Sequence, residues 1–288
     1  MKSFRTSFLK VCVLSLILVF SLPLNVCAKP LSPTPGLKTI KNLLQTALEP
    51  VGSTLYVWGG GWFRNVDGSY GSNHIGIHKE WKEFYDSQDE HYKWDDWDFQ
   101  TEKGLDCSGY IGWIVYNVIN TEDGEKGFVC SSKKMAKSFS NKGFGKYIKC
   151  SNVKDFKPGD IMSGDGPRHV YICIGQCEDK SVIFLHSSYQ GVHICGTAAP
   201  NGNFDSDAYK LAKKYMGKYY SDFCKRYPSF KNRTQDKEFY QQYIRDTSYL
   251  TQYNQMRWDV SESGFMSDPD GYLSMTTEKI LEDLFLEV

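Results

Sequence analysis

The sequence predicts an α+β fold, in which helices bracket a small antiparallel sheet. Apolar residues recur with helical spacing over 38–49 and 108–120, and the pattern becomes helical again after residue 201. Between these segments, short apolar runs separated by turn residues follow one another from 146 to 196. A single cysteine, Cys107, stands where the second helix should begin. We therefore expect a nucleophile at the N-terminus of a helix that packs on the sheet, with extra C-terminal helices.

The order of the elements follows from these patterns. A glycine-rich turn ends at Gly61, and residues 62–104 form a long aromatic and acidic excursion with one short helix near 81–85. Helices are predicted over 38–49, 108–120, from 132 to before 143, from a cap at 205 or 206, and over 276–286. Strands are predicted from 146, from 161, and over 169–175, 181–187 and 192–196, as a meander.

The N-terminal residues have the pattern of a secretory signal. Three cationic residues precede an apolar run over 11–24, and Val26-Cys27-Ala28 fits a cleavage site for small residues. A run of about 14 apolar residues is shorter than a bilayer span, so no stable membrane span is expected after cleavage. We interpret 1–28 as a signal peptide and expect a secreted or cell-wall associated bacterial protein. Lipidation of Cys27 is the alternative, and the two residues before it fit that poorly.

Composition limits the classes of partner. The chain has 34 basic and 34 acidic residues and no basic run, so we expect no nucleic-acid partner. Aromatic residues make up 15% of the chain, which suits a surface that holds sugars or peptides and equally a core filled with tyrosine. Seven cysteines follow residue 28, and this odd number predicts a free thiol, for which Cys107 is our choice. We expect a monomer.

Residues 104–112 contain the candidate nucleophile, Cys107. A thiol at a helix N-terminus faces exposed N–H groups and the positive end of the helix dipole, which favour the reactive thiolate. His169 opens one strand-like run and His186 ends the next. A cysteine, then a histidine, then a second polar ring is the order of a nucleophile, its base and an orienting group.

The third position is assigned to His186 rather than His193. The two runs that carry His169 and His186 should form an antiparallel hairpin that turns around Cys177-Glu178. Paired positions in such a hairpin have a nearly constant sum, which places His169 opposite His186 or Ser187. His193 falls on the following strand without such a pairing to His169, and we expect it to contribute little.

No metal or other cofactor is expected. His74 and His78 are spaced as zinc ligands on a helix, but Gly76 lies between them and no third ligand is evident. Asp268-Pro-Asp-Gly271 hints at calcium, but an EF-hand alignment puts Met266 at the first ligand position. We interpret the first segment as an exposed loop and the second as a turn.

Several motifs, in this order along the chain, resemble the NlpC family of cell-wall peptidases. They are Tyr56-Val-Trp-Gly-Gly60, Leu105-Asp-Cys-Ser-Gly109, Lys157-Pro-Gly-Asp-Ile161, His169-Val-Tyr-Ile-Cys-Ile-Gly175 and Phe184-Leu-His186. The similarity covers roughly residues 38–196 and does not extend to the C-terminal third. The gap between the glycine turn and Asp106 is far longer than is usual in the family.

The resemblance implies a papain-like cysteine peptidase that acts on the stem peptides of peptidoglycan. Such enzymes usually cut the amide between D-γ-glutamate and the diamino acid. By this resemblance Cys107 would attack, His169 would be the base and His186 would orient it.

The resemblance also implies the roles of three neighbouring residues. Tyr56 would face the nucleophile and help hold the oxyanion. Asp106 and Ser108 would line the subsite for the amino end of the stem peptide. The chain then divides into the signal peptide, a catalytic domain and an extension: 1–28, 29–200 with an insertion at 62–104, and 201–288, a helical C-terminal extension packed on the catalytic domain.

Two alternative functions remain open. An amidase of the related CHAP type cuts at the muramyl-alanine bond or in the cross-bridge, but it typically has an acidic or amide residue in place of His186. A non-catalytic cell-wall glycan-binding protein would use the tryptophans of the insertion for stacking, namely Trp62, Trp81, Trp94 and Trp97. The insertion lies between Tyr56 and Cys107, so we expect it either to form a wall of the substrate groove or to be a surface loop with its own small cluster.

Overall fold

A computed structural model of the chain describes residues 30–62, 72–164, 166–228, 230–231, 238–240 and 243–286. The predicted signal peptide at 1–28 lies outside these residues. No helix among them is both long enough and apolar enough to cross a membrane.

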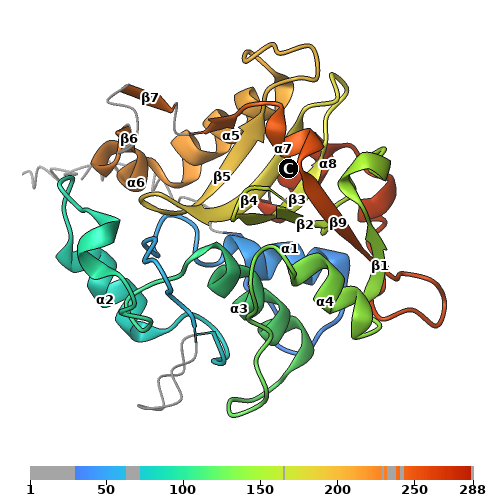
Figure 1. Cartoon of the computed structure of the whole chain (residues 1–288), viewed down its shortest axis with the longest axis horizontal. Helices are drawn as coiled ribbons and strands as arrows, with labels where there is room; N and C mark the ends of the chain where they lie inside the picture. The colour runs from blue at the N-terminus through green and yellow to red at the C-terminus, as the bar shows by residue number, and fades with distance from the viewer. Residues whose placement is uncertain are drawn as a thin grey trace, which may run out of the picture.

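The structure is a mixed fold of helices around one seven-stranded sheet (Figure 1), as the α+β prediction states. Its strands, in spatial order, are β1 (Gly145–Ile148), β9 (Tyr253–Trp258), β2 (Ile161–Gly164), β3 (Val170–Gln176), β4 (Val182–Ser188), β5 (Gly191–Thr197) and β8 (Ile244–Arg245). All neighbours are antiparallel except β5 and β8, which are parallel. A separate two-stranded sheet joins β6 (Phe230–Lys231) and β7 (Glu238–Tyr240).

In the described part of the chain six α-helices lie close to predicted positions, and two short ones, α6 (Ser221–Arg226) and α7 (Ser248–Thr251), were not predicted individually. The six are α1 (Ile40–Leu48), α2 (Lys79–Ser87), α3 (Cys107–Ile119), α4 (Met135–Asn141), α5 (Asp207–Tyr219) and α8 (Thr277–Leu284), with 3-10 turns η1 (Trp94–Trp97), η2 (Cys150–Asn152) and η3 (Tyr272–Ser274). Several helices begin at side-chain caps, which satisfy otherwise unpaired N–H groups. The Ser206 hydroxyl accepts from the Tyr209 N–H at 3.2 Å, at one of the two predicted starts of α5.

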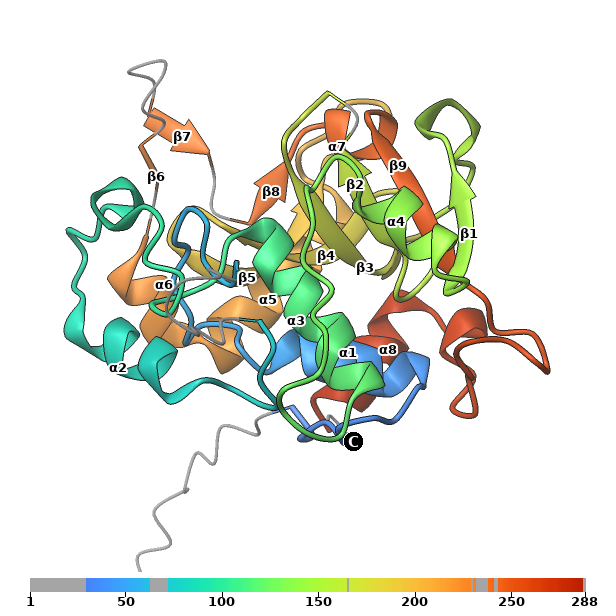
Figure 2. The same ribbon diagram turned by 60° about the horizontal axis from the view of Figure 1, so that its bottom comes forward.

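The two faces of the sheet are covered differently. Helices α1, α3 and α4 lie together on one side (Figure 1), and Figure 2 shows α3 beside α1. The main core joins α1, α3, α5 and α8 to the apolar side chains of β3, β4 and β5 that alternate toward them. A smaller cluster on the opposite face contains Tyr171, Phe184 and Tyr253, with Tyr249 of α7 packed against it.

The C-terminal third differs from the predicted helical extension. It supplies α5, α6 and α8, but also β8 and β9 of the main sheet. Strand β9 lies between β1 and β2, where Arg257 pairs with Lys146 and Met256 pairs with both Tyr147 and Ile161. The predicted meander from 146 is therefore interrupted, because β1 pairs with β9 and not with β2. The extension therefore packs on the sheet through α5 and α8 and also completes it with β8 and β9.

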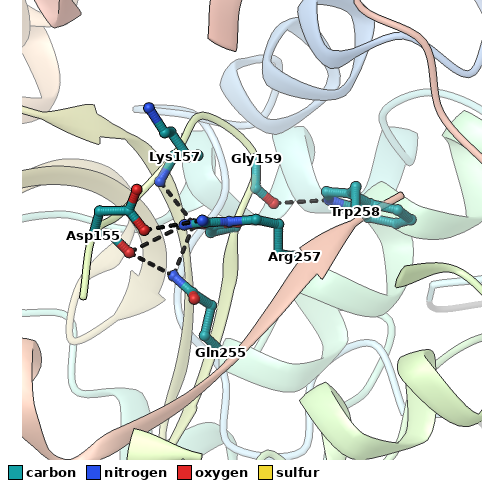
Figure 3. A network of polar contacts seen from close by, with 7 residues as sticks. Asp155, Lys157, Gly159, Gln255, Arg257 and Trp258 are labelled. Carbon is teal, nitrogen blue, oxygen red and sulfur yellow. Dashed lines mark hydrogen bonds and ion pairs between the residues drawn. The ribbon is translucent and has the colours of Figure 1, made fainter. Parts of the chain in front are cut away.

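Figure 3 shows Gln255 and Arg257 of β9 beside Asp155 and Lys157 of the segment before β2. A buried carboxylate in that segment connects the two: Asp160 is 1% exposed and accepts from the Lys157 N–H at 2.7 Å and from Gln255 Nε2 at 2.8 Å. The Arg257 guanidinium donates to it in bidentate form, through Nε at 3.1 Å and Nη2 at 2.7 Å. Arg257 Nη1 also reaches Asp155 at 2.9 Å. Gln255 and Arg257 of β9 thus share one buried carboxylate partner, which lies 95 and 97 positions away from them in the chain.

We predict that Arg257→Met lowers the free energy of unfolding by about 3–5 kcal/mol, because it leaves the Asp160 carboxylate buried without its charge partner. Urea denaturation of the full chain measures this change. Lys146→Met is the matched control, since Lys146 is exposed on β1 and pairs with Arg257 only through the backbone. It should change stability by about 0.5 kcal/mol or less. Equal effects for the two variants would contradict this role of Arg257.

Candidate active site

Cys107 is the first residue of α3, as the sequence predicts. Asp106 is the N-cap, and its Oδ1 accepts from the Gly109 N–H at 2.6 Å and from the Ser108 hydroxyl at 2.8 Å. The cap fixes where the helix begins and so fixes the direction of the thiol. Trp62 Nε1 donates to Ser108 Oγ at 3.0 Å, which adds a residue of the insertion to this network.

The glycine-rich turn packs directly on this helix start. A Cβ on Gly109 would lie 2.0 Å from the carbonyl oxygen of Gly60, and a Cβ on Gly60 would lie 2.5 Å from that of Gly104. The Asp106 N–H donates to the Gly60 oxygen at 3.0 Å. Glycine at these positions allows the two backbones to approach. The approach brings Tyr56, at the start of the turn, to the same cavity as Cys107.

That cavity has a volume of about 550 Å³. Its lining residues come from the glycine turn, the insertion, the start of α3 and the segments before α4 and β3: Tyr56, Trp58, Gly59, Trp62, Phe99, Thr101, Asp106, Cys107, Ser108, Ser131, Ser132, Lys133 and Arg168. Trp58, Trp62 and Phe99 are 38%, 37% and 54% exposed, so their rings are available to a ligand. Lys133 and Arg168 add two exposed cations.

The described part of the insertion forms part of the wall of this cavity. Trp62, Phe99 and Thr101 lie on the wall. Trp81 does not, because it is fully buried and packs on Trp113 with ring centres 5.8 Å apart. Trp94 stacks on Tyr189 and is not among the residues that line the cavity. The glycan-stacking role that the binder alternative gives to all four tryptophans therefore fails for Trp81.

The thiol itself differs from the predicted thiolate. Cys107 is 7% exposed, and burial, together with the nearby Asp106 carboxylate, raises the pKa of its thiol well above the usual range. The N–H groups of Val170, Ser108 and Cys107 itself oppose this rise without cancelling it. None of the seven cysteines among the described residues forms a disulfide bond. Cys107 does lie at the helix N-terminus, as predicted. However, the loss of hydration raises its pKa more than the helix dipole lowers it, so the resting group is a thiol.

Tyr56 lies beside this thiol and keeps its proton. Its ring makes edge contacts with Trp94 and Tyr189, with centres 5.8 and 5.9 Å away. Burial raises the pKa of the Tyr56 hydroxyl far above its ordinary value, and the nearby Cys107 contributes. The hydroxyl is therefore a hydrogen-bond donor at every physiological pH.

The two predicted catalytic histidines are in contact, and the contact extends to a third. His169 Nε2 lies 2.8 Å from His186 Nδ1. His186 Nε2 lies 3.0 Å from His193 Nε2, and His193 Nδ1 lies 2.9 Å from the Gly191 oxygen. The chain of three rings runs from His169, the residue before β3, across β4 to β5, and ends on a backbone carbonyl.

The hairpin that carries His169 and His186 has a register different from the predicted one. Ile172 pairs with Leu185 and Cys173 with Phe184, which places Tyr171 rather than His169 opposite His186. The difference arises at the turn: Gln176 pairs with Val182, so the hairpin turns around residue 179 and not around Cys177-Glu178. The bulge between Cys173 and Gly175 then moves the pairing one residue back toward the predicted register. The two histidines still share a face, as diagonal neighbours, and their rings meet at a centre distance of 5.0 Å.

These imidazoles rest in the neutral form. Burial lowers the pKa of His169 to about 3, with the Arg245 cation adding to the effect. Burial also lowers the pKa of His186 well below its usual value, followed by the effects of His193 and Arg245. Arg245 is 6% exposed on β8, and the sequence offered no sign that it would lie near the histidines.

Sequence reasoning missed His193, although a signal was present. The second hairpin, β4 to β5, turns at Tyr189 and Gln190, so its paired positions have a constant sum. The sum rule used for the first hairpin pairs His186 with His193, and the structure shows this pair.

One group of possible metal ligands occurs among the described residues. The ligand atoms of His186, His193 and Cys195 lie within 4.8 Å of one another, and all three residues are buried. However, the two imidazole Nε2 atoms are hydrogen-bonded to each other, and the Arg245 cation lowers the pKa of His186. A metal ion would have to break the bond and enter beside a cation, so this arrangement favours a hydrogen-bond chain.

The two weaker metal motifs have structural roles. His74 Nδ1 lies 2.8 Å from the carboxylate oxygen Oδ2 of Asp123. His78 is the N-cap of α2, and its side chain accepts a hydrogen bond from the Glu80 N–H. Asp268 accepts from the N–H groups of Tyr272 and Leu273 at 2.9 Å each, which makes the predicted turn.

Comparison of the chain with models of known protein families, with curated proteins and with solved structures found no match. The arguments about this site therefore depend on its own residues and geometry.

We predict that alkylation of Cys107 by iodoacetamide accelerates about tenfold per pH unit from pH 6 to pH 9. Below the pKa of a thiol, the thiolate fraction rises tenfold per unit, and burial has raised this pKa. Peptide mass spectrometry follows the modification, and the partly exposed Cys150 monitors the reagent in the same samples. A rate that levels off near neutral pH would show a thiolate instead.

Proposed function

We propose that the protein is an exported, papain-like cysteine peptidase that hydrolyses the stem peptides of peptidoglycan. One observation carries the proposal: Cys107 at the start of α3 opens into an aromatic cavity, while the Val170 N–H, one residue after His169, faces its thiol. The hydrogen bond from His169 to His186 supplies the orientation that a general base requires. The order of these residues is also that of the NlpC family.

The groups present support acyl transfer in two steps. His169 accepts the thiol proton as Cys107 Sγ attacks the substrate carbonyl carbon. The Tyr56 hydroxyl and the N–H groups at the start of α3 are donors for the oxyanion that forms. The tetrahedral intermediate expels the amine, which takes the proton from His169. Water, deprotonated by the same imidazole, then hydrolyses the thioester and restores the thiol.

The cavity suits a substrate with the features of a stem peptide. Asp106 and Ser108 offer acceptor oxygens at one end, which fit an amino group. Lys133 and Arg168 offer cations that fit the free carboxylates of γ-linked glutamate and of the diamino acid. Trp58, Trp62 and Phe99 cover the apolar parts of such a peptide or an attached sugar. The amide between D-γ-glutamate and the diamino acid is the proposed scissile bond.

We predict that Cys107→Ala abolishes hydrolysis, with a loss of several orders of magnitude in kcat/KM, because the covalent nucleophile is removed. Muropeptides are incubated with each variant and the products identified by mass spectrometry. Cys150→Ala is the matched control, since this partly exposed cysteine lies on η2 and not in the cavity. Circular dichroism confirms that both variants fold.

The outcomes separate the proposal from its alternatives. Cleavage after D-γ-glutamate supports the proposed bond, whereas release of intact stems from the glycan would indicate the CHAP-type amidase. Binding of muropeptides without any cleavage, unchanged in Cys107→Ala, would indicate a glycan-binding protein. Wild-type activity in Cys107→Ala would exclude the proposed mechanism.

We predict that EDTA leaves the activity unchanged, because the proposed steps use a thiol and neutral imidazoles. The rate is measured before and after dialysis against the chelator. Loss of activity that zinc restores would contradict the mechanism and would direct attention to His186, His193 and Cys195 as ligands.

A further inference from the structure

We propose that His193 is a positioning residue, which sets the direction of the hydrogen bonds along the three-histidine chain and so leaves Nδ1 of His169 unprotonated and able to act as the base. Its effect on catalysis rests on the hydrolysis proposed above. The direction of the bonds does not, because it follows from the chain of contacts and the neutral state of the rings.

The direction starts at the Gly191 carbonyl. A carbonyl oxygen only accepts hydrogen bonds, so His193 Nδ1, 2.9 Å away, must carry a proton. In a neutral imidazole the other nitrogen is then an acceptor, which is His193 Nε2. His186 Nε2 therefore donates to it across 3.0 Å, and His186 Nδ1 becomes the acceptor. His169 Nε2 donates in turn across 2.8 Å.

This direction leaves the base in its working form. With its proton on Nε2, His169 has a lone pair on Nδ1, the only ring nitrogen not engaged by His186. The opposite direction would put the proton of His169 on Nδ1 and leave no acceptor for the thiol. One backbone carbonyl, two rings away, thus selects the tautomer of the base.

The Gly191 carbonyl, where the direction starts, is held in place by the neighbouring backbone. Gly191 is the first residue of β5, and a Cβ there would lie 2.3 Å from the carbonyl oxygen of Thr54, so the two backbones are in contact. The Val192 N–H donates to the same oxygen at 2.9 Å. Fixed in this way, the Gly191 carbonyl cannot turn to offer His193 a different partner.

The surroundings of His193 favour its neutral form. The residue is fully buried, and its ring lies near those of Phe223 and Tyr243, with centres 6.5 and 6.4 Å away. An imidazolium in such a site would lose most of its hydration. The Arg245 cation near His169 and His186 further disfavours an additional positive charge on the chain. A neutral His193 has one proton, and the carbonyl places it on Nδ1.

Nitrogen NMR of the full chain, labelled with ¹⁵N-histidine, tests the direction without any substrate. Two-bond ¹⁵N–¹H correlations identify which ring nitrogen carries the proton. We expect the Nδ1–H tautomer for His193 and the Nε2–H tautomer for both His186 and His169. A proton on Nδ1 of His186, or on both nitrogens of His193, would overturn the inference.

Two substitutions test the consequence. His193→Phe keeps a ring but removes the acceptor for His186, so His186 and His169 should show mixed tautomers and kcat should fall about 10- to 100-fold with little change in KM. His193→Gln offers Oε1 as an acceptor and should restore the Nε2–H tautomers and most of kcat. Tyr243→Phe, which changes a neighbouring ring without touching the chain, is the control and should behave as wild type.

The readouts distinguish this inference from the proposed function. If the wild type cleaves no stem peptide, the proposed function fails, and the NMR spectra still decide the direction of the bonds. If cleavage occurs but folded His193→Phe keeps the wild-type kcat, or His193→Gln is as slow as His193→Phe, the positioning role fails and the proposed function stands.

Discussion

The buried carboxylate of Asp160 is the interaction on which the sheet depends. A charge at 1% exposure is stable only if its partners satisfy it, and here Arg257 and Gln255 of β9 do so together with the Lys157 N–H. These contacts require β9 to lie beside β2. With β9 in place, the sheet is continuous from β1 to β8, and β2 supports β3, the strand that follows His169. The C-terminal third is thus needed for the site although it contributes little to the cavity.

The candidate site forms where the glycine-rich turn, the start of α3 and the sheet meet. Glycines at 60, 104 and 109 allow the turn after Tyr56 to contact the first turn of α3, which directs Cys107 into the cavity. The histidines lie on the sheet, where one continuous hydrogen-bond chain fixes each ring relative to the next. Desolvation keeps both the thiol and the imidazoles uncharged at rest. In the proposed mechanism, charge would therefore develop only during the reaction, when a bound substrate stabilises it.

Several elements could be predicted because their signal is local. Helices α1 and α8 have an apolar face with a period near 3.6, and α3 is a continuous apolar segment that is buried almost all round. Thr39, Asp106 and Thr276 are capping residues at the starts of these helices. Strand β9 could not, because Asn254, Gln255 and Arg257 look like surface residues until Cys150 and Asp160 provide partners far away in the chain. The register of β3 with β4 was also unpredictable, because the hairpin turns around residue 179 and a bulge then shifts the pairing by one residue, and neither feature leaves a mark in the alternation.

The sequence by itself determined which chemical groups are present and in what order: Cys107 at a helix start, then His169, then His186, with glycines where backbones must approach. Such features depend on neighbours within a few residues, so they can be read along the chain. Only the tertiary structure decided the protonation state of the thiol, the entry of Arg245 and Tyr249 beside the histidines, and the place of His193 in their chain. Desolvation and long-range hydrogen bonds depend on what folding brings together, and no short stretch of sequence encodes them.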